Sequence, residues 1–276
     1  MVVIRGALDT HAMRHAQRAF HWSLQHPGPR AHTVLAGIAG AFYQDHANPA
    51  AFPAYHDLLC ETGLTELVGN LIGSQGLWLL YEQIWLKRGR TLRTPWHQDL
   101  AYVPMAGEQV ATAWINLDPV ERERSLEFVR GSHRGLLYNP TAFDPDDPTA
   151  AMYAPGVWPA LPDIEARRDA WPIVSTAIEP GDIVVFHPAV LHGGAPTRAG
   201  EQRRTISLRF FGDDTVCMPR PESGVHEIDR LTTDDGSGDP MVAMARQPAG
   251  TLFRHPGFRC LRSPDGATSG IRASHE

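Results

Sequence analysis

The sequence of 276 residues has only three cysteines, Cys60, Cys217 and Cys260, and they lie far apart. A disulfide framework or a thiolate zinc site needs more cysteines or C-x-x-C spacing, so neither is expected. No run approaches the roughly 18 apolar residues of a membrane span, and the N-terminus lacks the charged and apolar regions of a secretory signal. These absences predict a soluble protein of a reducing compartment, which we expect in the cytoplasm and without a membrane partner.

The sequence also lacks an excess of positive charge. It has 25 Lys and Arg against 31 Asp and Glu, a formal net charge of −6. A short basic run at Lys87, Arg88, Arg90 and Arg93 is expected to be a solvated loop, with contact to an anionic substrate as the alternative. Nucleic-acid binding needs a concentrated basic surface. Nucleic acid is therefore not an expected partner.

Hydrophobic periodicity divides the chain into a helical part and a strand-rich part. Apolar residues recur at helical spacing in 13–24, 34–42 and 64–72, which predicts the buried faces of three helices. Strands are expected further along, at 77–87, 110–117, 126–133, 173–192 and 203–211. Helices followed by short strands predict a mainly β fold with flanking helices, built on an antiparallel barrel or a double-stranded β-helix (jelly-roll, cupin-like) core.

We expect residues 1–276 to form one domain. It would consist of a helical part at 1–73, the core at 74–212 and a C-terminal extension at 213–276, whose weak patterning predicts loose structure. Segment 134–172 is too long for a plain connection, so a lid or substrate loop is expected. Its aromatic residues, which we expect at the substrate pocket, are Tyr138, Tyr153, Trp158 and Trp171.

The stretch TPWHQDLAYVP contains His97 and Asp99 two positions apart. Residues i and i+2 of an extended segment point the same way, so the pair can supply two ligands to one metal. An iron site of the facial-triad type needs two imidazoles and one carboxylate. His192, before two glycines, is the candidate third ligand, and His187 is its competitor with a packing role as the alternative. Spacing alone leaves open that these residues are unrelated.

Five segments occur in a characteristic order: TPWHQD, AWINLDPV, SLEFVRGSH, EPGDIVVFHPAVLHGG and RRTIS. Together they resemble the phytanoyl-CoA dioxygenase family, which comprises iron(II)- and 2-oxoglutarate-dependent oxygenases. The resemblance runs from about residue 80 to residue 212. It implies that His97, Asp99 and His192 are the iron ligands at the catalytic centre. Asp99 argues against a halogenase, in which a small residue replaces the carboxylate.

The resemblance also implies that Arg203, on the strand after His192, binds the far carboxylate of 2-oxoglutarate. A guanidinium grips a carboxylate through two parallel hydrogen bonds, which lysine cannot do. Arg203 would share its strand face with Thr205 and Ser207. Arg204 is the alternative, and its side chain would point to the opposite face.

Three further positions bear on the co-substrate pocket. Gln83, which shares a strand face with Tyr81, is a candidate pocket residue. Trp114 stands where the family often has a tryptophan lining the pocket, although a core aromatic is the alternative. Family members often have serine two residues after the distal histidine. Here that position is Gly194, so one possible hydroxyl contact to 2-oxoglutarate is missing.

The resemblance implies Fe(II) as the metal and 2-oxoglutarate and O2 as co-substrates, with succinate and CO2 as co-products. The expected reaction is the oxidation, most simply the hydroxylation, of an unactivated C–H in a small organic molecule or secondary metabolite. No CoA-binding feature is present in the sequence. Two alternatives share the jelly-roll scaffold: a non-oxidative metal-dependent isomerase or lyase, and a non-catalytic protein that binds a small molecule.

Overall fold

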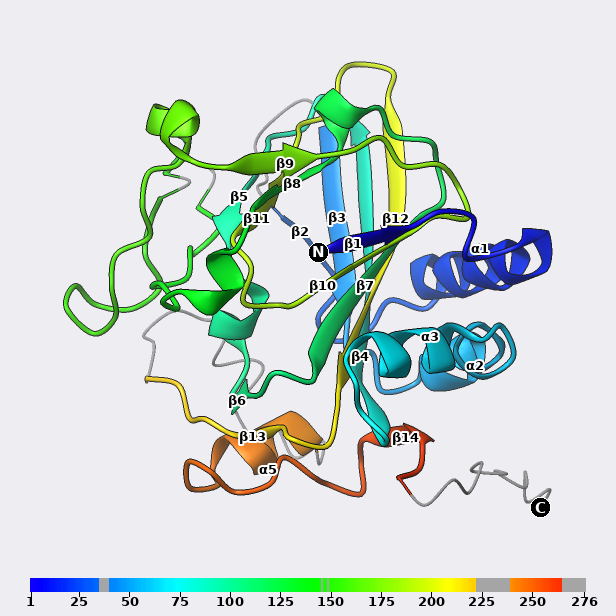
Figure 1. The fold of residues 1–276 in the computed structure, drawn as a ribbon. Helices are drawn as coiled ribbons and strands as arrows, with labels where there is room; N and C mark the ends of the chain where they lie inside the picture. The colour runs from blue at the N-terminus through cyan, green and yellow to red at the C-terminus, as the bar shows by residue number, and fades with distance from the viewer. Residues whose placement is uncertain (35–39, 145, 148, 222–238, 265–276) are drawn as a thin grey trace.

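Two antiparallel β-sheets form the centre of the structure, a computed structural model that describes residues 1–34, 40–144, 146–147, 149–221 and 239–264. Within these residues the larger sheet has eight strands: β1 (Val2–Ile4), β10 (Ile183–Phe186), β7 (Val110–Asn116), β12 (Gln202–Phe211), β4 (Leu77–Gly89), β3 (Gly40–His46) and β2 (His32–Thr33) in spatial order, and β14 (Arg259–Arg262), which also pairs with β4. The smaller sheet consists of β5 (Thr94–His97), β11 (His192–Gly194), β8 (Leu126–Val129) and β9 (Ile173–Ser175). A separate pair joins β6 (Met105–Ala106) to β13 (Val216–Cys217). The two sheets form a jelly-roll core, as predicted (Figure 1).

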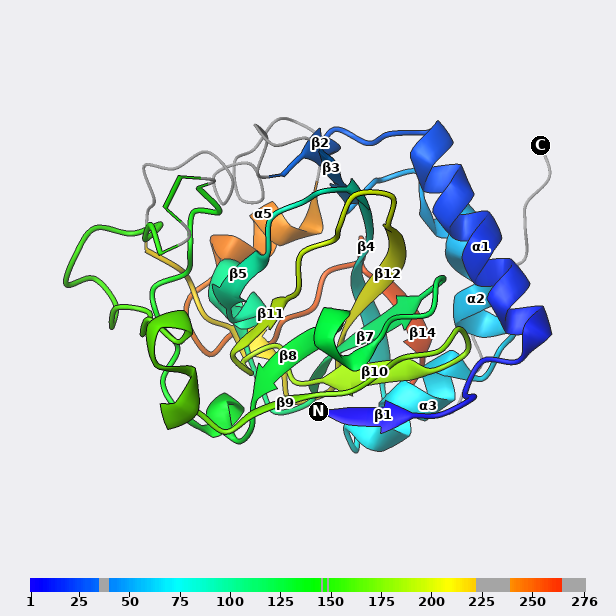
Figure 2. The same ribbon diagram turned by 90° about the horizontal axis from the view of Figure 1, so that it is seen from above.

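Three helices cover one flank of the larger sheet, and the smaller sheet lies on its other side (Figures 1 and 2). The helices are α1 (Thr10–Gln25), α2 (Phe52–Cys60) and α3 (Leu64–Leu71). Helix α1 begins where the Asp9 carboxylate accepts a hydrogen bond from the Ala12 N–H at 2.8 Å, a standard N-cap. Helix α3 follows Gly63, whose φ of +73° suits glycine. The predicted helices at 13–24 and 64–72 are confirmed.

Strand alternation gives the larger sheet one apolar face and one polar face. The apolar face packs on the helices and includes Leu77, Ile84, Ile115, Ile206 and Leu208. On the other face β4 and β12 place four residue pairs opposite one another: Lys87 with Arg203, Trp85 with Thr205, Gln83 with Ser207, and Tyr81 with Arg209. This face is turned away from the helical core, so the polar side chains of both strands gather inside the jelly roll.

The helix predicted at 34–42 is wrong where the structure describes it. Residues 40–46 form β3, which pairs antiparallel with β4, and the Val34 N–H donates to the Phe42 carbonyl at 2.6 Å. Residues 35–39 lie outside the described residues. Phe42 is buried beside Trp85, with the ring centroids 5.4 Å apart. Pairing with the long strand β4 outweighs the helical spacing of a few apolar residues.

The C-terminal extension is better ordered than its composition predicts. Within the described residues it contributes α5 (Pro240–Ala245) and β14, which adds to the larger sheet beside β4. Phe253 and Phe258 are buried against Phe211, at ring-centroid distances of 5.3 and 5.1 Å. The expectation of loose structure therefore fails for 239–264, while 222–238 and 265–276 lie outside the described residues.

Segment 134–172 is irregular apart from short turns such as η4 (Glu165–Ala170). Tyr138 and Trp171 pack in a side cluster with Trp96. Tyr153 and Trp158 contact each other at a ring-centroid distance of 5.6 Å. None of these four aromatic residues lines either of the two cavities that border His97 and Asp99. Phe143, from the same segment, does line one of these cavities.

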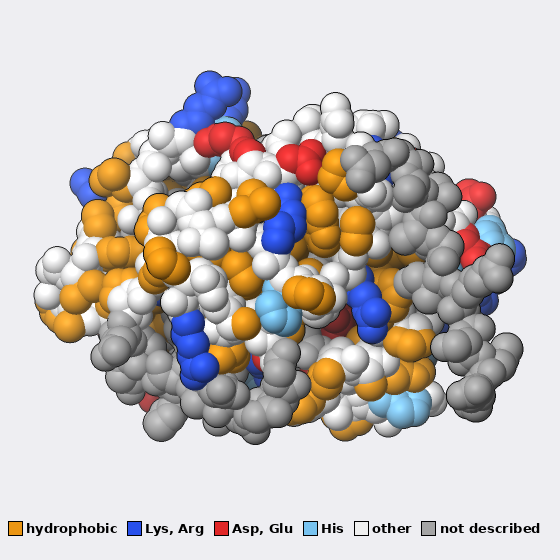
Figure 3. All heavy atoms as spheres, turned by 90° about the horizontal axis from the view of Figure 1, so that it is seen from below, with side chains coloured by type: hydrophobic (Ala, Val, Ile, Leu, Met, Phe, Trp, Pro, Cys, Tyr) orange, Lys and Arg blue, Asp and Glu red, His pale blue; other side chains and the backbone are white. Residues whose placement is uncertain are grey.

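One face of the molecule and the helices bear on the expected absence of nucleic-acid and membrane partners. On the face shown in Figure 3, basic side chains are separated from one another by hydrophobic and uncharged ones. None of the helices in the described part of the chain is long and apolar enough to cross a bilayer.

Candidate active site

Two histidines meet across the ladder between β5 and β11. His97 and His192 are direct register partners, and their ring centroids are 4.2 Å apart. Asp99 opens the 3-10 turn η1 (Asp99–Tyr102), and its Oδ1 lies 3.4 Å from His97 Nε2 and 3.9 Å from His192 Nε2. All three side chains are buried. The structure thus brings together the three ligands proposed from the sequence.

The two imidazoles present the ring nitrogen that a metal needs. His97 Nδ1 donates to the Pro95 carbonyl at 2.8 Å, and His192 Nδ1 donates to the Val190 carbonyl at 3.0 Å. In the neutral form of each ring this leaves Nε2, the nitrogen on the side of Asp99, with the lone pair that a metal needs. Burial, with the neighbouring His97, lowers the pKa of His192 to about 3, so its ring is neutral. Two neutral imidazoles and one carboxylate oxygen are the donor set of a facial iron triad, and the residues fit that metal.

Arg209 holds the other oxygen of Asp99. Its Nη2 lies 3.2 Å from Asp99 Oδ2, and its Nη1 donates to Gln83 Oε1 at 2.6 Å. Thr112 Oγ1 also donates to Asp99 Oδ2 at 3.3 Å. Burial alone would raise the pKa of Asp99, but the Arg209 guanidinium holds it well below its ordinary value. Asp99 is therefore an anion with one oxygen engaged by Arg209 and Thr112 and the other turned to the histidines.

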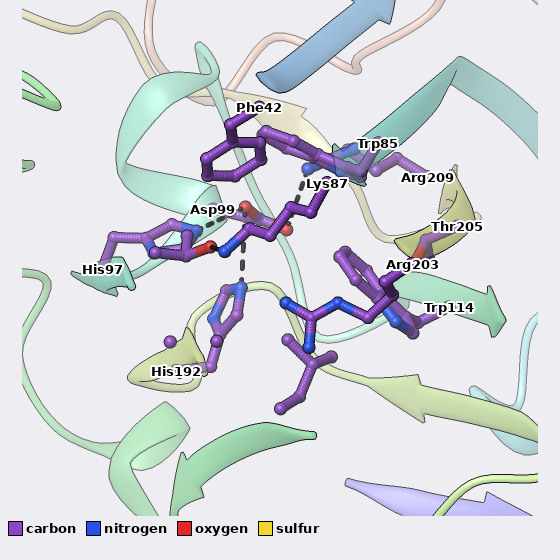
Figure 4. Close-up of a pocket in the computed structure, with 14 residues that line it drawn as sticks. Phe42, Trp85, Lys87, His97, Asp99, Trp114, His192, Arg203, Thr205 and Arg209 are labelled. Atoms are coloured by element: carbon purple, nitrogen blue, oxygen red, sulfur yellow. Dashed lines mark hydrogen bonds and ion pairs between the residues drawn. The ribbon is translucent and has the colours of Figure 1, made fainter. Parts of the chain in front are cut away.

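A first cavity borders the triad and is lined by two basic side chains, the buried Lys87 and the partly buried Arg203 (Figure 4). They face each other across the β4–β12 ladder. Lys87 Nζ donates to Thr94 Oγ1 at 3.0 Å and to the Leu92 carbonyl at 3.1 Å. Arg203 donates to the carbonyls of Arg124 and Ala195, the latter at 2.8 Å. Among the described residues, the hydrogen-bond acceptors of both cations are thus uncharged hydroxyl and carbonyl oxygens.

The electrostatics of this cavity favour an anionic ligand. Burial, together with the nearby Arg203 and Arg93, holds the pKa of Lys87 well below its ordinary value. Burial, together with Arg124, lowers the pKa of Arg203 to about 10. Like charges on opposite strands destabilise each other, and a carboxylate bound between them would relieve that cost. The expectation that Lys87 lies in a solvated loop is wrong: only 3% of its surface is exposed, because it shares the inner face of β4 with Trp85.

The remaining sequence candidates take distinct places. Trp114 lines the first cavity, and its Nε1 donates to Asn116 Oδ1 at 3.1 Å. Arg204 points away from the cavity and pairs with Asp118 at 2.6 Å. His187 is held by backbone groups, with its Nε2 3.2 Å from the Gly107 carbonyl, and is not part of the triad.

A second cavity shares Trp85, His97, Asp99 and Arg209 with the first. Gln83 lines this cavity rather than the first one, and it links Arg209 to Gln44 through hydrogen bonds of 2.6 Å each. Arg209 was not predicted from the sequence. A signal for it existed, since Arg209 continues the row of Arg203, Thr205 and Ser207 at every second position of β12. The sequence gives no such signal for His46 and Phe143, which also line this cavity.

Comparison with known proteins places this site in a family. A model of the phytanoyl-CoA dioxygenase (PhyH) family matches residues 1–205. The chain belongs to this family. A probable phytanoyl-CoA dioxygenase from Caenorhabditis elegans is 30% identical over 173 residues, which cover 60% of this chain and 53% of that protein. The peroxisomal phytanoyl-CoA dioxygenase of Mus musculus is 30% identical over 131 residues, 47% of this chain and 36% of that protein. The chain thus spans about half or less of the length of these two PhyH relatives.

Among solved structures, one similar fold is the epimerase SnoN from nogalamycin biosynthesis, in complex with Fe3+, α-ketoglutarate and nogalamycin RO. It superimposes with a TM-score of 0.66 at 22% identity, over 95% of this chain and 93% of SnoN. At this identity the likeness establishes the fold, and it agrees with the jelly-roll core of the PhyH chain.

The glycines after His192 mark one departure from the PhyH pattern. Gly194 replaces the serine that PhyH members often have, and a Cβ there would meet Thr94 Oγ1 at 3.2 Å and Leu126 Cδ2 at 3.5 Å. A Cβ on Gly193 would approach the Thr94 carbonyl oxygen to 3.0 Å. A Cβ at position 194 thus meets side chains that can shift slightly, whereas a Cβ at position 193 presses on a backbone oxygen, so position 193 favours glycine more strongly.

Proposed function

We propose that the protein is an Fe(II)- and 2-oxoglutarate-dependent oxygenase that hydroxylates an unactivated C–H of a small organic molecule or secondary metabolite. One observation carries the proposal: the histidine and carboxylate donors of a facial triad share a single buried cavity with Lys87 and Arg203. The complexes of SnoN support it, since that fold binds iron, α-ketoglutarate and nogalamycin RO.

One set of residues would bind the metal, and another would bind the co-substrate. His97, Asp99 and His192 would hold Fe(II) through their Nε2 and Oδ1 atoms, and the opposite side would stay open. When bound, iron supplies the oxidising chemistry with O2 and 2-oxoglutarate, and succinate and CO2 are the co-products. Arg203, assisted by Lys87, would bind the distal carboxylate of 2-oxoglutarate, and Trp114 would form a wall of that cavity. Gln83 would act indirectly by holding Arg209 beside Asp99.

Oxygen-dependent formation of succinate from 2-oxoglutarate, with Fe(II) added, tests the proposal. The activity is expected in the wild type and should disappear in His97→Ala and in Asp99→Ala. Full activity in either variant would contradict the triad.

A matched pair on β12 tests the co-substrate site. Arg203→Met should weaken 2-oxoglutarate binding, measured by calorimetry, by at least about 30-fold, because removing one partner of a buried charge pair typically costs about 2–5 kcal/mol. Arg204→Met, whose side chain lies outside the cavity, should change the affinity by less than about 2-fold. Equal effects of the two substitutions would refute the assignment.

The same assays separate the two alternatives. Anaerobic turnover of a substrate without 2-oxoglutarate would favour a non-oxidative isomerase or lyase. Failure of the wild type to bind Fe(II) or 2-oxoglutarate would favour a non-catalytic binding protein.

A further inference from the structure

The second cavity reaches the triad beside the one that holds Lys87 and Arg203. Both cavities are lined by His97 and Asp99, and Trp85 forms a wall that they share. If 2-oxoglutarate occupies the first cavity, as the proposed function requires, the second is the place from which a substrate C–H can reach the metal. The chemistry of its walls then describes the substrate.

Charge is the first constraint. Among the described residues that line the second cavity, the charged side chains are Asp99 and Arg209, and they neutralise each other at 3.2 Å. His46 is also there, and burial, with the nearby cations Arg30 and Arg209, holds its pKa well below the ordinary value, so its ring is neutral. A carboxylate, phosphate or ammonium group entering this cavity would find no unpaired counter-charge on its described walls. Burying such a group costs several kcal/mol.

Unsatisfied polar atoms are the second constraint. Trp85 Nε1 and His46 Nδ1 are buried and have no hydrogen-bond partner among the described residues. A buried polar atom left without a partner costs about 1–3 kcal/mol, and such atoms are uncommon in folded proteins. The indole N–H is a donor only, so it calls for an oxygen acceptor. A neutral imidazole nitrogen either donates or accepts, and a hydroxyl group satisfies both cases.

Aromatic rings are the third constraint. The ring centroids of Tyr102 and Phe143 are 6.0 Å apart, and those of Phe143 and His97 are 5.3 Å apart. The rings of Tyr81 and His46 also line this cavity, with their centroids 5.8 Å apart. Aromatic walls of this kind favour flat rings, which stack on them or meet them edge to face.

We propose that the second cavity binds the substrate through an uncharged ring system that carries hydroxyl or carbonyl oxygens, with Trp85 Nε1 and His46 as its hydrogen-bonding partners. This inference rests on the proposed function, because it places 2-oxoglutarate in the first cavity. It excludes from the cavity amino acids, amines and acidic groups such as the phosphates of CoA. Trp85 and His46 are then specificity-determining residues.

A set of naphthalene probes tests the charge and oxygen requirements while the ring stays constant. The probes are naphthalene, 2-naphthol, 2-naphthoate and 2-naphthylmethylammonium. Their dissociation constants are measured by ligand-observed NMR on the full chain loaded with Zn(II) and 2-oxoglutarate, so that no turnover occurs. 2-Naphthol is expected to bind at least about 10-fold more tightly than either charged probe, because those must leave water without a counter-charge.

Variants assign the effect to named atoms. Trp85→Phe keeps an aromatic ring and removes the N–H, so it should weaken 2-naphthol binding by about 2- to 12-fold more than it weakens naphthalene binding. His46→Phe should also reduce the preference for 2-naphthol over naphthalene. Trp171→Phe is the matched control: its buried Nε1 also lacks a partner among the described residues, but Trp171 lines neither cavity. This control should leave all four dissociation constants unchanged.

Three outcomes would overturn the inference. The first is a charged probe that binds as tightly as 2-naphthol. The second is a preference for 2-naphthol that does not fall in Trp85→Phe. The third is the failure of every ring compound to bind at millimolar concentration. Calorimetry of 2-oxoglutarate on the same Zn(II) protein separates this inference from the proposed function. Loss of 2-oxoglutarate binding would refute the proposed function, whereas intact binding with the wrong order of probes would refute the ring-substrate inference alone.

Discussion

Replacing Arg209 by methionine should destabilise the metal-free protein severely. Arg209 and Asp99 are both buried, and their charged atoms are 3.2 Å apart. Methionine keeps much of the side-chain volume but leaves the Asp99 carboxylate without its cationic partner. Removing one member of a buried ion pair costs about 3–5 kcal/mol, because the remaining charge stays out of water. We expect the free energy of unfolding to fall by this amount.

Urea unfolding at pH 7.5, with a chelator present, measures the change. The double variant Asp99→Asn/Arg209→Met should recover most of the lost stability, because it leaves no unpaired charge. Arg204→Met is the control on the same strand: its pair with Asp118 is partly exposed, so the loss should be below about 1 kcal/mol. The reasoning fails if Arg209→Met costs no more than Arg204→Met, or if the double variant is less stable than Arg209→Met alone.

Three further predictions follow from packing and burial. Burial raises the pKa of Glu82 from 4.5 to about 8, so the folded state keeps a proton that the unfolded chain releases, and stability is lost as the pH rises through this range. Glu82→Gln, which stays neutral, should reduce the fall in unfolding free energy between pH 5 and pH 8.5 by on the order of 4 kcal/mol, and equal pH profiles would contradict the assignment. Gly193→Ala should cost about 1–3 kcal/mol in urea unfolding because its Cβ would press on a carbonyl oxygen at 3.0 Å, while Gly194→Ala should be nearly neutral. Phe253→Ala should cost about 3–5 kcal/mol in the same assay, and a loss below 1 kcal/mol would mean that the C-terminal part packs independently of the barrel.

The fold class and the pairing of His97 with Asp99 could be predicted from the sequence, because both depend on local pattern. The two-residue period of β12 placed Arg203 and Arg204 on opposite faces, and the structure agrees. His97 and Asp99 were recognisable because they stand two positions apart, and the family resemblance supplied His192 as their distant partner. Their meeting depends on the register between β5 and β11, which the sequence does not encode locally.

The errors share one cause, which is that tertiary pairing decides where a residue lies. Lys87 belongs to a basic run, yet the alternation that turns Trp85 to the inside of the jelly roll also buries Lys87 there. Residues 40–46 form a strand because β4 offers an edge beside them. Phe253 gives no strong local signal, but the aromatic contacts with Phe211 hold it in place. His46 and Phe143 reach the second cavity from separate segments, and no sequence spacing links them.

Strand β4 carries residues for both cavities on one face: Tyr81 and Gln83 line the second, Trp85 lines both, and Lys87 lines the first. Its neighbours β3 and β12 fix it on either side, and side chains two positions apart are separated by about 6.7 Å. If the two cavities hold substrate and co-substrate as proposed, point substitutions at one end of the strand would alter the choice of substrate and leave co-substrate binding intact. Deleting a single residue between them would turn one end of the face outward and uncouple the two cavities. We therefore expect this strand to tolerate substitutions more readily than insertions or deletions.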